Sequence, residues 1–190
     1  MKAILEDVYN RAWKNQESAT GCAQSVIAAL QDCVDFVPKN DDVFKASSAL
    51  AGGLGSSNQG TCGALSAGVM IISHLFGRSR EEFEQHRQRA DVDFLDEGAK
   101  CWRLAYELTE RFLLEYGSCT CKDVMKRMYG KNLEGIRPDS PVAYAFARSY
   151  SQHPSGGSRS VVATVARWTA ELLIVRKEQI SNIGDTRHLA

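Results

Sequence analysis

The sequence carries no net charge, because its 23 Lys and Arg residues are balanced by 23 Asp and Glu residues. A protein without net charge creates no long-range field toward polyanions, so we expect neither nucleic acid nor an anionic membrane as a partner. Proline is scarce, with 4 residues in 190, and 44% of the residues are hydrophobic. This composition is typical of a folded domain rather than of a disordered chain.

Long hydrophobic runs are also missing. Glu6 and Asp7 interrupt the apolar pattern at the N-terminus, so we expect no secretory signal and a cytoplasmic protein. The longest weakly polar run, residues 61–76, is too short to cross a bilayer. We expect it to form a buried core helix, in which His74 is a hydrogen-bonded core residue rather than a metal ligand.

The sequence shows no strand pattern, whereas apolar residues recur at intervals of three and four. We therefore predict an all-α, single-domain helical bundle of about six to seven helices. The domain is expected to span residues 1–182, with a last helix over 161–180 and a tail over 183–190. Residues 131–160 hold three of the four prolines and are predicted to be the least regular part.

Motifs for nucleotide binding and for zinc hydrolase chemistry are absent. The glycine-rich tract 51–60 is not followed by the Gly-Lys-Ser/Thr of a phosphate-binding loop, and no histidine pair has HxxxH or HExxH spacing. The charged segment 78–89 is predicted to be a solvated helix. Six cysteines remain to be explained, and in a reducing compartment they indicate metal or redox chemistry more than disulfides.

Three of the cysteines share one context. Cys22, Cys62 and Cys121 each stand at a predicted helix start, directly after Gly or Thr. Free backbone N–H groups and the positive end of the helix dipole favour a thiolate there. We therefore expect these three thiols to be acidified and to converge in space. For any one of them, simple packing beneath a helix turn is the alternative explanation.

The other three cysteines have different contexts. Cys33 lies about 16 Å along the helix from Cys22, and Cys101 belongs to an apolar helix stripe, so we expect both to be core residues. Cys119 is two residues before Cys121, and a tight turn could aim both sulfurs at one ion.

Five segments, taken together, resemble the redox-active C_GCAxxG_C_C family. They are residues 21–26, 53–55, 60–66, 76–78 and 112–121, and the resemblance covers residues 8–130. It implies an all-helical fold and cysteine-based redox or iron–sulfur chemistry. The family's first cysteine falls on Cys22, its Cys-Gly-Ala cysteine on Cys62 and its third on Cys121. Its last cysteine aligns near Ser158-Arg159-Ser160, where this chain has none, and we predict that Cys119 supplies the missing ligand.

We therefore expect a redox protein that uses Cys22, Cys62 and Cys121. Either these thiolates, with Cys119, bind an iron–sulfur cluster, or the first three run thiol–disulfide exchange or electron transfer with a partner that the sequence does not identify. Two alternatives stay open. The same four thiolates could bind structural zinc, or the chain could be a non-catalytic helical interaction protein, a homodimer without cofactor, whose cysteines are remnants.

Overall fold

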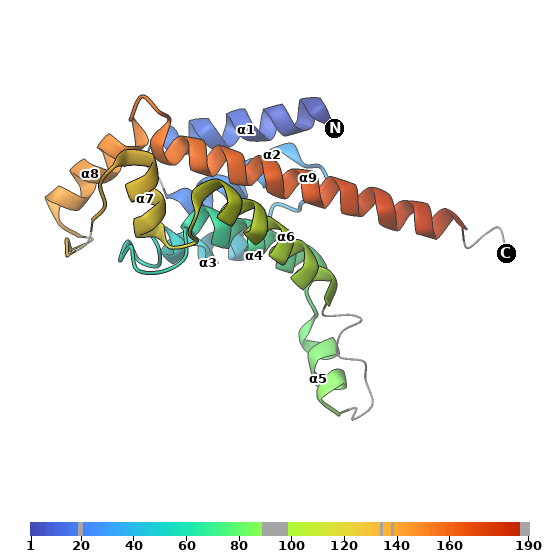
Figure 1. The fold of residues 1–190 in the computed structure, drawn as a ribbon. Coiled ribbons are helices and arrows are strands. Elements are labelled where there is room, and N and C mark those ends of the chain that lie inside the picture. Colours follow the sequence, from blue (N-terminus) through green and yellow to red (C-terminus); the bar gives the residue numbers. More distant parts are fainter. Residues whose placement is uncertain (19–20, 89–98, 134, 138, 187–190) are drawn as a thin grey trace.

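The computed structural model describes residues 1–18, 21–88, 99–133, 135–137 and 139–186. Within these ranges the chain forms nine α-helices, one short 3-10 helix and no strand (Figure 1). The all-α prediction is confirmed, with more helices than the six to seven expected. The α-helices are α1 (Lys2–Glu17), α2 (Cys22–Cys33), α3 (Asp41–Ala46), α4 (Gly63–Phe76), α5 (Arg80–Gln88), α6 (Ala99–Tyr116), α7 (Cys121–Tyr129), α8 (Pro141–Ser151) and α9 (Gly157–Thr186); the 3-10 helix is η1 (Ser48–Leu50).

Helix α9 organises the bundle. It packs against α1, α2, α4, α6, α7 and α8. Its apolar residues recur at helical spacing, and Val162, Val165, Ala166 and Leu173 are all buried. In Figure 1, α1 and α9 run side by side along one side of the molecule, and α2 lies beneath them. The main core therefore lies between α9 and the helices α1, α2, α4 and α6.

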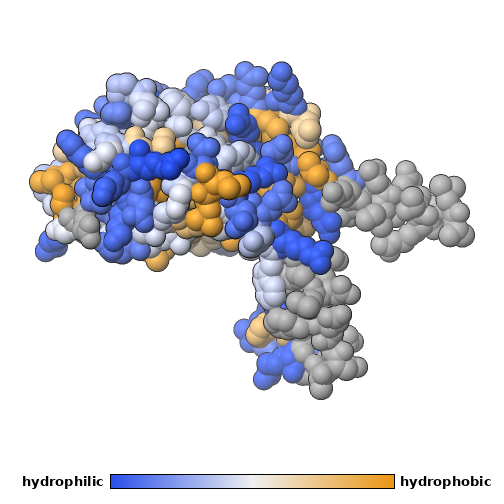
Figure 2. All heavy atoms as spheres, in the orientation of Figure 1, coloured by the Kyte–Doolittle hydropathy of each residue, from blue (hydrophilic) through white to orange (hydrophobic). Residues whose placement is uncertain are grey.

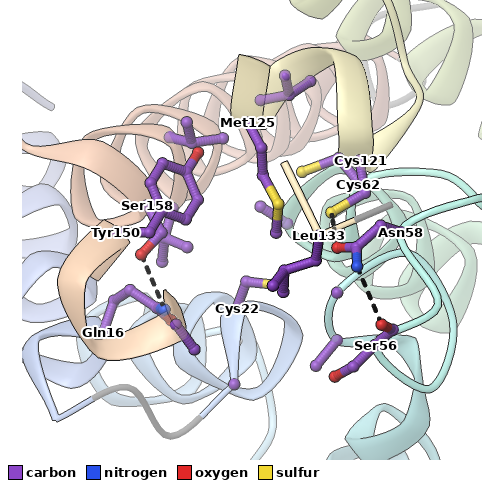
Figure 3. Close-up of a pocket in the computed structure, with 18 of the residues that line it drawn as sticks. Gln16, Cys22, Ser56, Asn58, Cys62, Cys121, Met125, Leu133, Tyr150 and Ser158 are labelled. Carbon is purple, nitrogen blue, oxygen red and sulfur yellow. Dashed lines mark hydrogen bonds between the residues drawn. The ribbon is translucent and has the colours of Figure 1, made fainter. Parts of the chain in front are cut away.

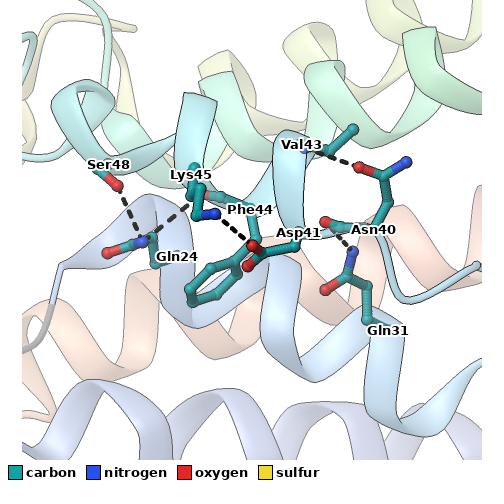
Figure 4. Close-up of polar contacts among 8 residues, drawn as sticks. All are labelled: Gln24, Gln31, Asn40, Asp41, Val43, Phe44, Lys45 and Ser48. Atoms are coloured by element: carbon teal, nitrogen blue, oxygen red, sulfur yellow. Dashed lines mark hydrogen bonds and ion pairs between the residues drawn. The ribbon is translucent and has the colours of Figure 1, made fainter.

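Polar contacts hold the short helix α3 against α2 (Figure 4). The side chain of Asn40 caps α3 by accepting from the backbone N–H of Val43 at 2.9 Å. From α2, Gln31 donates to the backbone oxygen of Asn40 at 3.2 Å, and Gln24 donates to Ser48 Oγ at 3.0 Å. These bonds anchor the segment that leads into the glycine-rich tract beside the start of α2.

Helix α8 was not predicted. It lies within residues 131–160, which we expected to be irregular, and this expectation is wrong for 141–151. Ser140 caps the helix by accepting from the backbone N–H of Ala143 at 3.2 Å, and Pro141 occupies the first turn. Proline is compatible with that position, because the N–H it lacks would have no helical partner there. The prediction of an irregular segment rested on the number of prolines and did not take the Ser140-Pro141 start signal into account.

Two further expectations need correction. Helix α9 continues to Thr186, so neither its predicted end near Ile180 nor the tail predicted from 183 agrees with residues 181–186; residues 187–190 lie outside the described ranges. His74 is exposed on α4 rather than part of the core, because it follows the last buried turn of that helix.

The charged segment after α4 does form an exposed helix, α5. It projects away from the bundle in Figure 1, and Figure 2 shows mostly hydrophilic side chains over it. The predicted helix is confirmed at 80–88, and those of its side chains whose burial is described are mostly exposed, while Arg89 lies outside the described residues. No helix in the described ranges combines the length and apolarity needed to cross a membrane.

Candidate functional site: a cavity lined by three cysteines

A cavity of about 200 Å³ lies where the starts of three helices meet, and Cys22, Cys62 and Cys121 line it. Cys22 is the first residue of α2, Cys62 is the N-cap of α4 and Cys121 is the first residue of α7. In Figure 3 all three side chains point into the cavity. The predicted helix starts thus bring together three thiols that are about forty to a hundred residues apart in the chain.

Backbone hydrogen bonds fix two of these starts next to each other. Thr61 and Thr120 form an isolated antiparallel bridge. On either side of it, Cys62 N–H donates to the Cys119 oxygen at 2.7 Å and Cys121 N–H donates to the Gly60 oxygen at 2.9 Å. The sequence has no apolar alternation that would predict this pairing, because the pairing involves only a few residues. It holds Cys62 and Cys121 in a defined register.

Two glycines make room for the cysteines. A Cβ on Gly63 would lie 2.5 Å from the sulfur of Cys22 and 2.6 Å from the Leu50 oxygen. Gly53 has φ of +68°, and a Cβ there would lie 2.7 Å from the Cβ of Cys121. Any side chain at either position would displace a cavity cysteine or its neighbours. The glycine-rich tract therefore serves close packing around the thiols.

The three thiols are not acidified, which corrects our prediction. Desolvation raises the pKa of Cys22, although backbone N–H groups, including those of Gly52 and Gly63, oppose the effect. Desolvation, followed by repulsion from Cys22, raises the pKa of Cys62 to about 12. Desolvation also raises the pKa of Cys121, with Cys62 and Cys22 contributing. Backbone N–H groups at the helix starts do lower the pKa of these thiols. Desolvation and repulsion between the neighbouring sulfurs raise the pKa by more than those groups lower it.

The other cysteines lie outside this cavity. Cys101 is buried in the α6 stripe, as expected, and Cys33 is half-buried at the far end of α2. Cys119 is half-buried and packs against the main core; desolvation raises its pKa. Across the described ranges no group of three or more His, Cys, Asp or Glu side chains is placed to hold a single metal ion. All six cysteines are free thiols.

A buried polar network that the sequence did not reveal borders the cavity. Gln16 accepts from Ser25 Oγ at 3.1 Å and donates to Ser158 Oγ at 3.2 Å. Ser151 donates to the backbone oxygen of Gln16 at 2.7 Å. Gln16 and Ser158 are both cavity-lining residues (Figure 3). These bonds join four helices at the side of the cavity that faces α8 and α9.

Two more lining residues, Asn58 and Tyr150, were not predicted. Asn58 accepts a long hydrogen bond from the Cys121 thiol, at 3.8 Å. Tyr150 is buried on α8, and Cys62, Cys121 and Cys22 contribute to raising its pKa, after desolvation. Tyr150 could not be placed at the site without knowing that α8 exists.

A comparison of the sequence with protein-family models gives a match that covers this site. The family model described as "Putative redox-active protein (C_GCAxxG_C_C)" matches residues 20–172. The chain belongs to this family. The C_GCAxxG_C_C match includes the three cavity cysteines, and it runs through α8 into α9 instead of ending at 130 as the resemblance had indicated. No curated protein and no solved structure matches the chain.

Proposed function

We propose that this C_GCAxxG_C_C protein is a redox protein in which the thiolates of Cys22, Cys62 and Cys121 hold an iron–sulfur cluster. One observation carries the proposal: three thiols from three separate helix starts line one cavity. Cysteine thiolates are the usual ligands of such clusters, which supply one-electron transfer when bound.

The chemistry of the donor set supports this assignment. The three thiols hinder one another's ionisation, since Cys22 raises the pKa of Cys62, and both raise that of Cys121. A cationic iron centre offsets this repulsion, because metal binding favours the deprotonated form of each ligand. Backbone N–H groups lie at the Cys22 and Cys62 sulfurs. Hydrogen bonds to ligand sulfurs are one of the factors that set a cluster's reduction potential.

The other chemistries that the sequence left open fit less well. A thiol with a pKa of about 12, as at Cys62, is almost entirely protonated at neutral pH, whereas thiol–disulfide exchange needs a thiolate. A single zinc ion would fill little of a cavity of about 200 Å³, since one water molecule alone occupies about 30 Å³ of liquid. A cluster of several atoms uses that space better.

The fourth ligand position has two candidates. Cys119 is the thiol nearest in sequence, and its backbone oxygen accepts from Cys62, but its side chain does not line the cavity. Ser158 does line the cavity, and it belongs to the segment Ser158-Arg159-Ser160, near which the resemblance places the family's last cysteine. We propose that the fourth position opens toward Ser158, so that Ser158→Cys would add a fourth thiolate and increase iron retention.

The test is anaerobic purification followed by analysis of iron, acid-labile sulfide and zinc, with a visible absorption spectrum. We expect iron and sulfide in wild type, and a loss of most of both in Cys62→Ser. Cys33→Ser is the matched control, because Cys33 is also a free thiol but lies outside the cavity. Wild-type protein that contains zinc alone, or no metal, would overturn the proposal in favour of a structural zinc site or a cofactor-free interaction protein.

A further inference from the structure

The cavity extends from the cysteines to the surface beside α8. Four of its lining residues come from that helix: Ala143, Tyr144, Ala147 and Tyr150. Ala143 and Tyr150 are buried, whereas Ala147 is exposed and Tyr144 is 70% exposed. The buried pair therefore forms the inner wall and the exposed pair forms the mouth. A molecule from solution has a route to the space beside the thiols.

The wall of this space is neutral and mostly apolar. None of the described residues that line the cavity carries a formal charge at neutral pH. On the inner side, Met125 and Leu133 contribute apolar surface together with Val161 and Val162. Burying an uncompensated charge here would cost far more than burying an uncharged molecule. The lining thus selects against ionic ligands.

One polar group on this wall, the Tyr150 hydroxyl, forms no hydrogen bond in the described part of the chain. Tyr150 is 5% exposed and lines the cavity; its hydroxyl oxygen is not among the completely buried polar atoms, so it keeps some accessible surface. A tyrosine hydroxyl that borders a cavity and has no partner in the protein can donate its hydrogen bond to a molecule bound there. Burial and the three thiols also raise the pKa of Tyr150, so its proton remains available for donation at neutral pH. Figure 3 shows Tyr150 on the cavity wall supplied by α8.

We propose that the part of the cavity next to α8 binds a small, uncharged organic molecule whose oxygen accepts a hydrogen bond from the Tyr150 hydroxyl. In the metal-free protein the volume is adequate: the cavity without a bound centre measures about 200 Å³, and an apolar protein cavity of about 150 Å³ holds a benzene. The inference rests on the proposed function, because the molecule would be the one on which the redox site acts. Its binding is measurable without any turnover.

The test uses the full-length chain, isolated anaerobically with ¹³C-methyl methionine, and two probes of similar shape. Acetophenone carries a carbonyl oxygen, and ethylbenzene does not. We expect acetophenone to shift the methyl signal of Met125, which lines the cavity, and not that of Met70, which lies on α4 outside it. Tyr150→Phe should weaken acetophenone binding about fivefold, and leave ethylbenzene binding unchanged.

A second variant guards against misfolding of the first. Ala147→Trp places a large side chain at the exposed mouth and should abolish the Met125 shift while leaving the Met70 signal in place. An unchanged Met125 signal with both probes, or equal acetophenone affinity in wild type and Tyr150→Phe, would overturn the inference. Iron analysis of the same sample separates the two proposals: iron without probe binding removes only this inference, and probe binding without iron removes only the cluster.

Discussion

Cys62 and Cys101 are buried to nearly the same degree, with 5% and 7% exposed, yet their surroundings differ in kind. Cys62 caps α4 and faces a cavity shared with two other thiols, whereas Cys101 lies inside the apolar stripe of α6. Burial therefore does not distinguish a candidate ligand from a packing residue in this protein. What distinguishes them is a position at a helix start, next to a glycine that leaves room for a second sulfur.

The strongest test of this comparison changes a glycine in α4 and leaves every cysteine in place. A Cβ on Gly63 would meet the Cys22 sulfur at 2.5 Å, whereas a Cβ on Gly68 would meet Thr169 Oγ1 at 2.6 Å. We expect both alanine variants to lose about 1–3 kcal/mol of unfolding free energy, as overpacked sites do. Only Gly63→Ala should also lose most of its iron. Urea unfolding and iron analysis check this, and equal iron in the two variants would contradict it.

A smaller effect is expected from pH. In metal-free protein the pKa of Cys62 is about 12 when folded and 9.0 in the reference state, so between these values the folded form binds more protons than the unfolded form. Stability is therefore complete below pH 9 and falls as pH rises above it, by about 1 kcal/mol at pH 10 for this one group.

Urea unfolding at pH 8 and pH 10 measures that fall. Cys62→Ala should show a fall smaller by the same amount, because it lacks the titrating thiol. If wild type and variant depend identically on pH, the pKa of Cys62 is not raised, and if wild type loses less stability than the variant, the acidified site that we first predicted is the better description. Rapid alkylation of folded Cys62 at pH 6 would lead to the same conclusion.

The smallest effect is expected at Cys119, because its side chain lies outside the cavity. Cys119→Ser should keep at least about nine-tenths of the wild-type iron, as Cys33→Ser should. Loss of even an outer-shell partner of a metal ligand typically costs about tenfold or more in metal affinity. The sequence alone indicated a sharp loss for Cys119→Ser. Iron analysis of the two variants side by side decides between these readings, and a large loss confined to Cys119→Ser would restore Cys119 as the fourth ligand.

Much of the fold and part of the site could be predicted from the sequence. The weakly polar run 61–76 predicted the core helix that the structure has at Gly63–Phe76, and the Gly or Thr before each cavity cysteine indicated a helix start. The raised pKa values could not be predicted, because desolvation depends on which elements cover a residue. The place of Gln16 at the site could not be predicted either. Gln16 forms hydrogen bonds to Ser25 and to Ser158, which is 142 residues away in the chain. Local patterns contain no information on such partners.

The bridge between Thr61 and Thr120 has a consequence for the order of folding. Pairing of residues so far apart requires closure of a long loop, which costs chain entropy before any contact compensates for it. During synthesis, Cys22 and Cys62 emerge well before Cys121, and the α9 wall with Val161 and Val162 emerges later still. The three thiols can therefore become neighbours in a closed cavity only once most of the polypeptide has left the ribosome. Assembly of the complete thiol site is a late event in maturation.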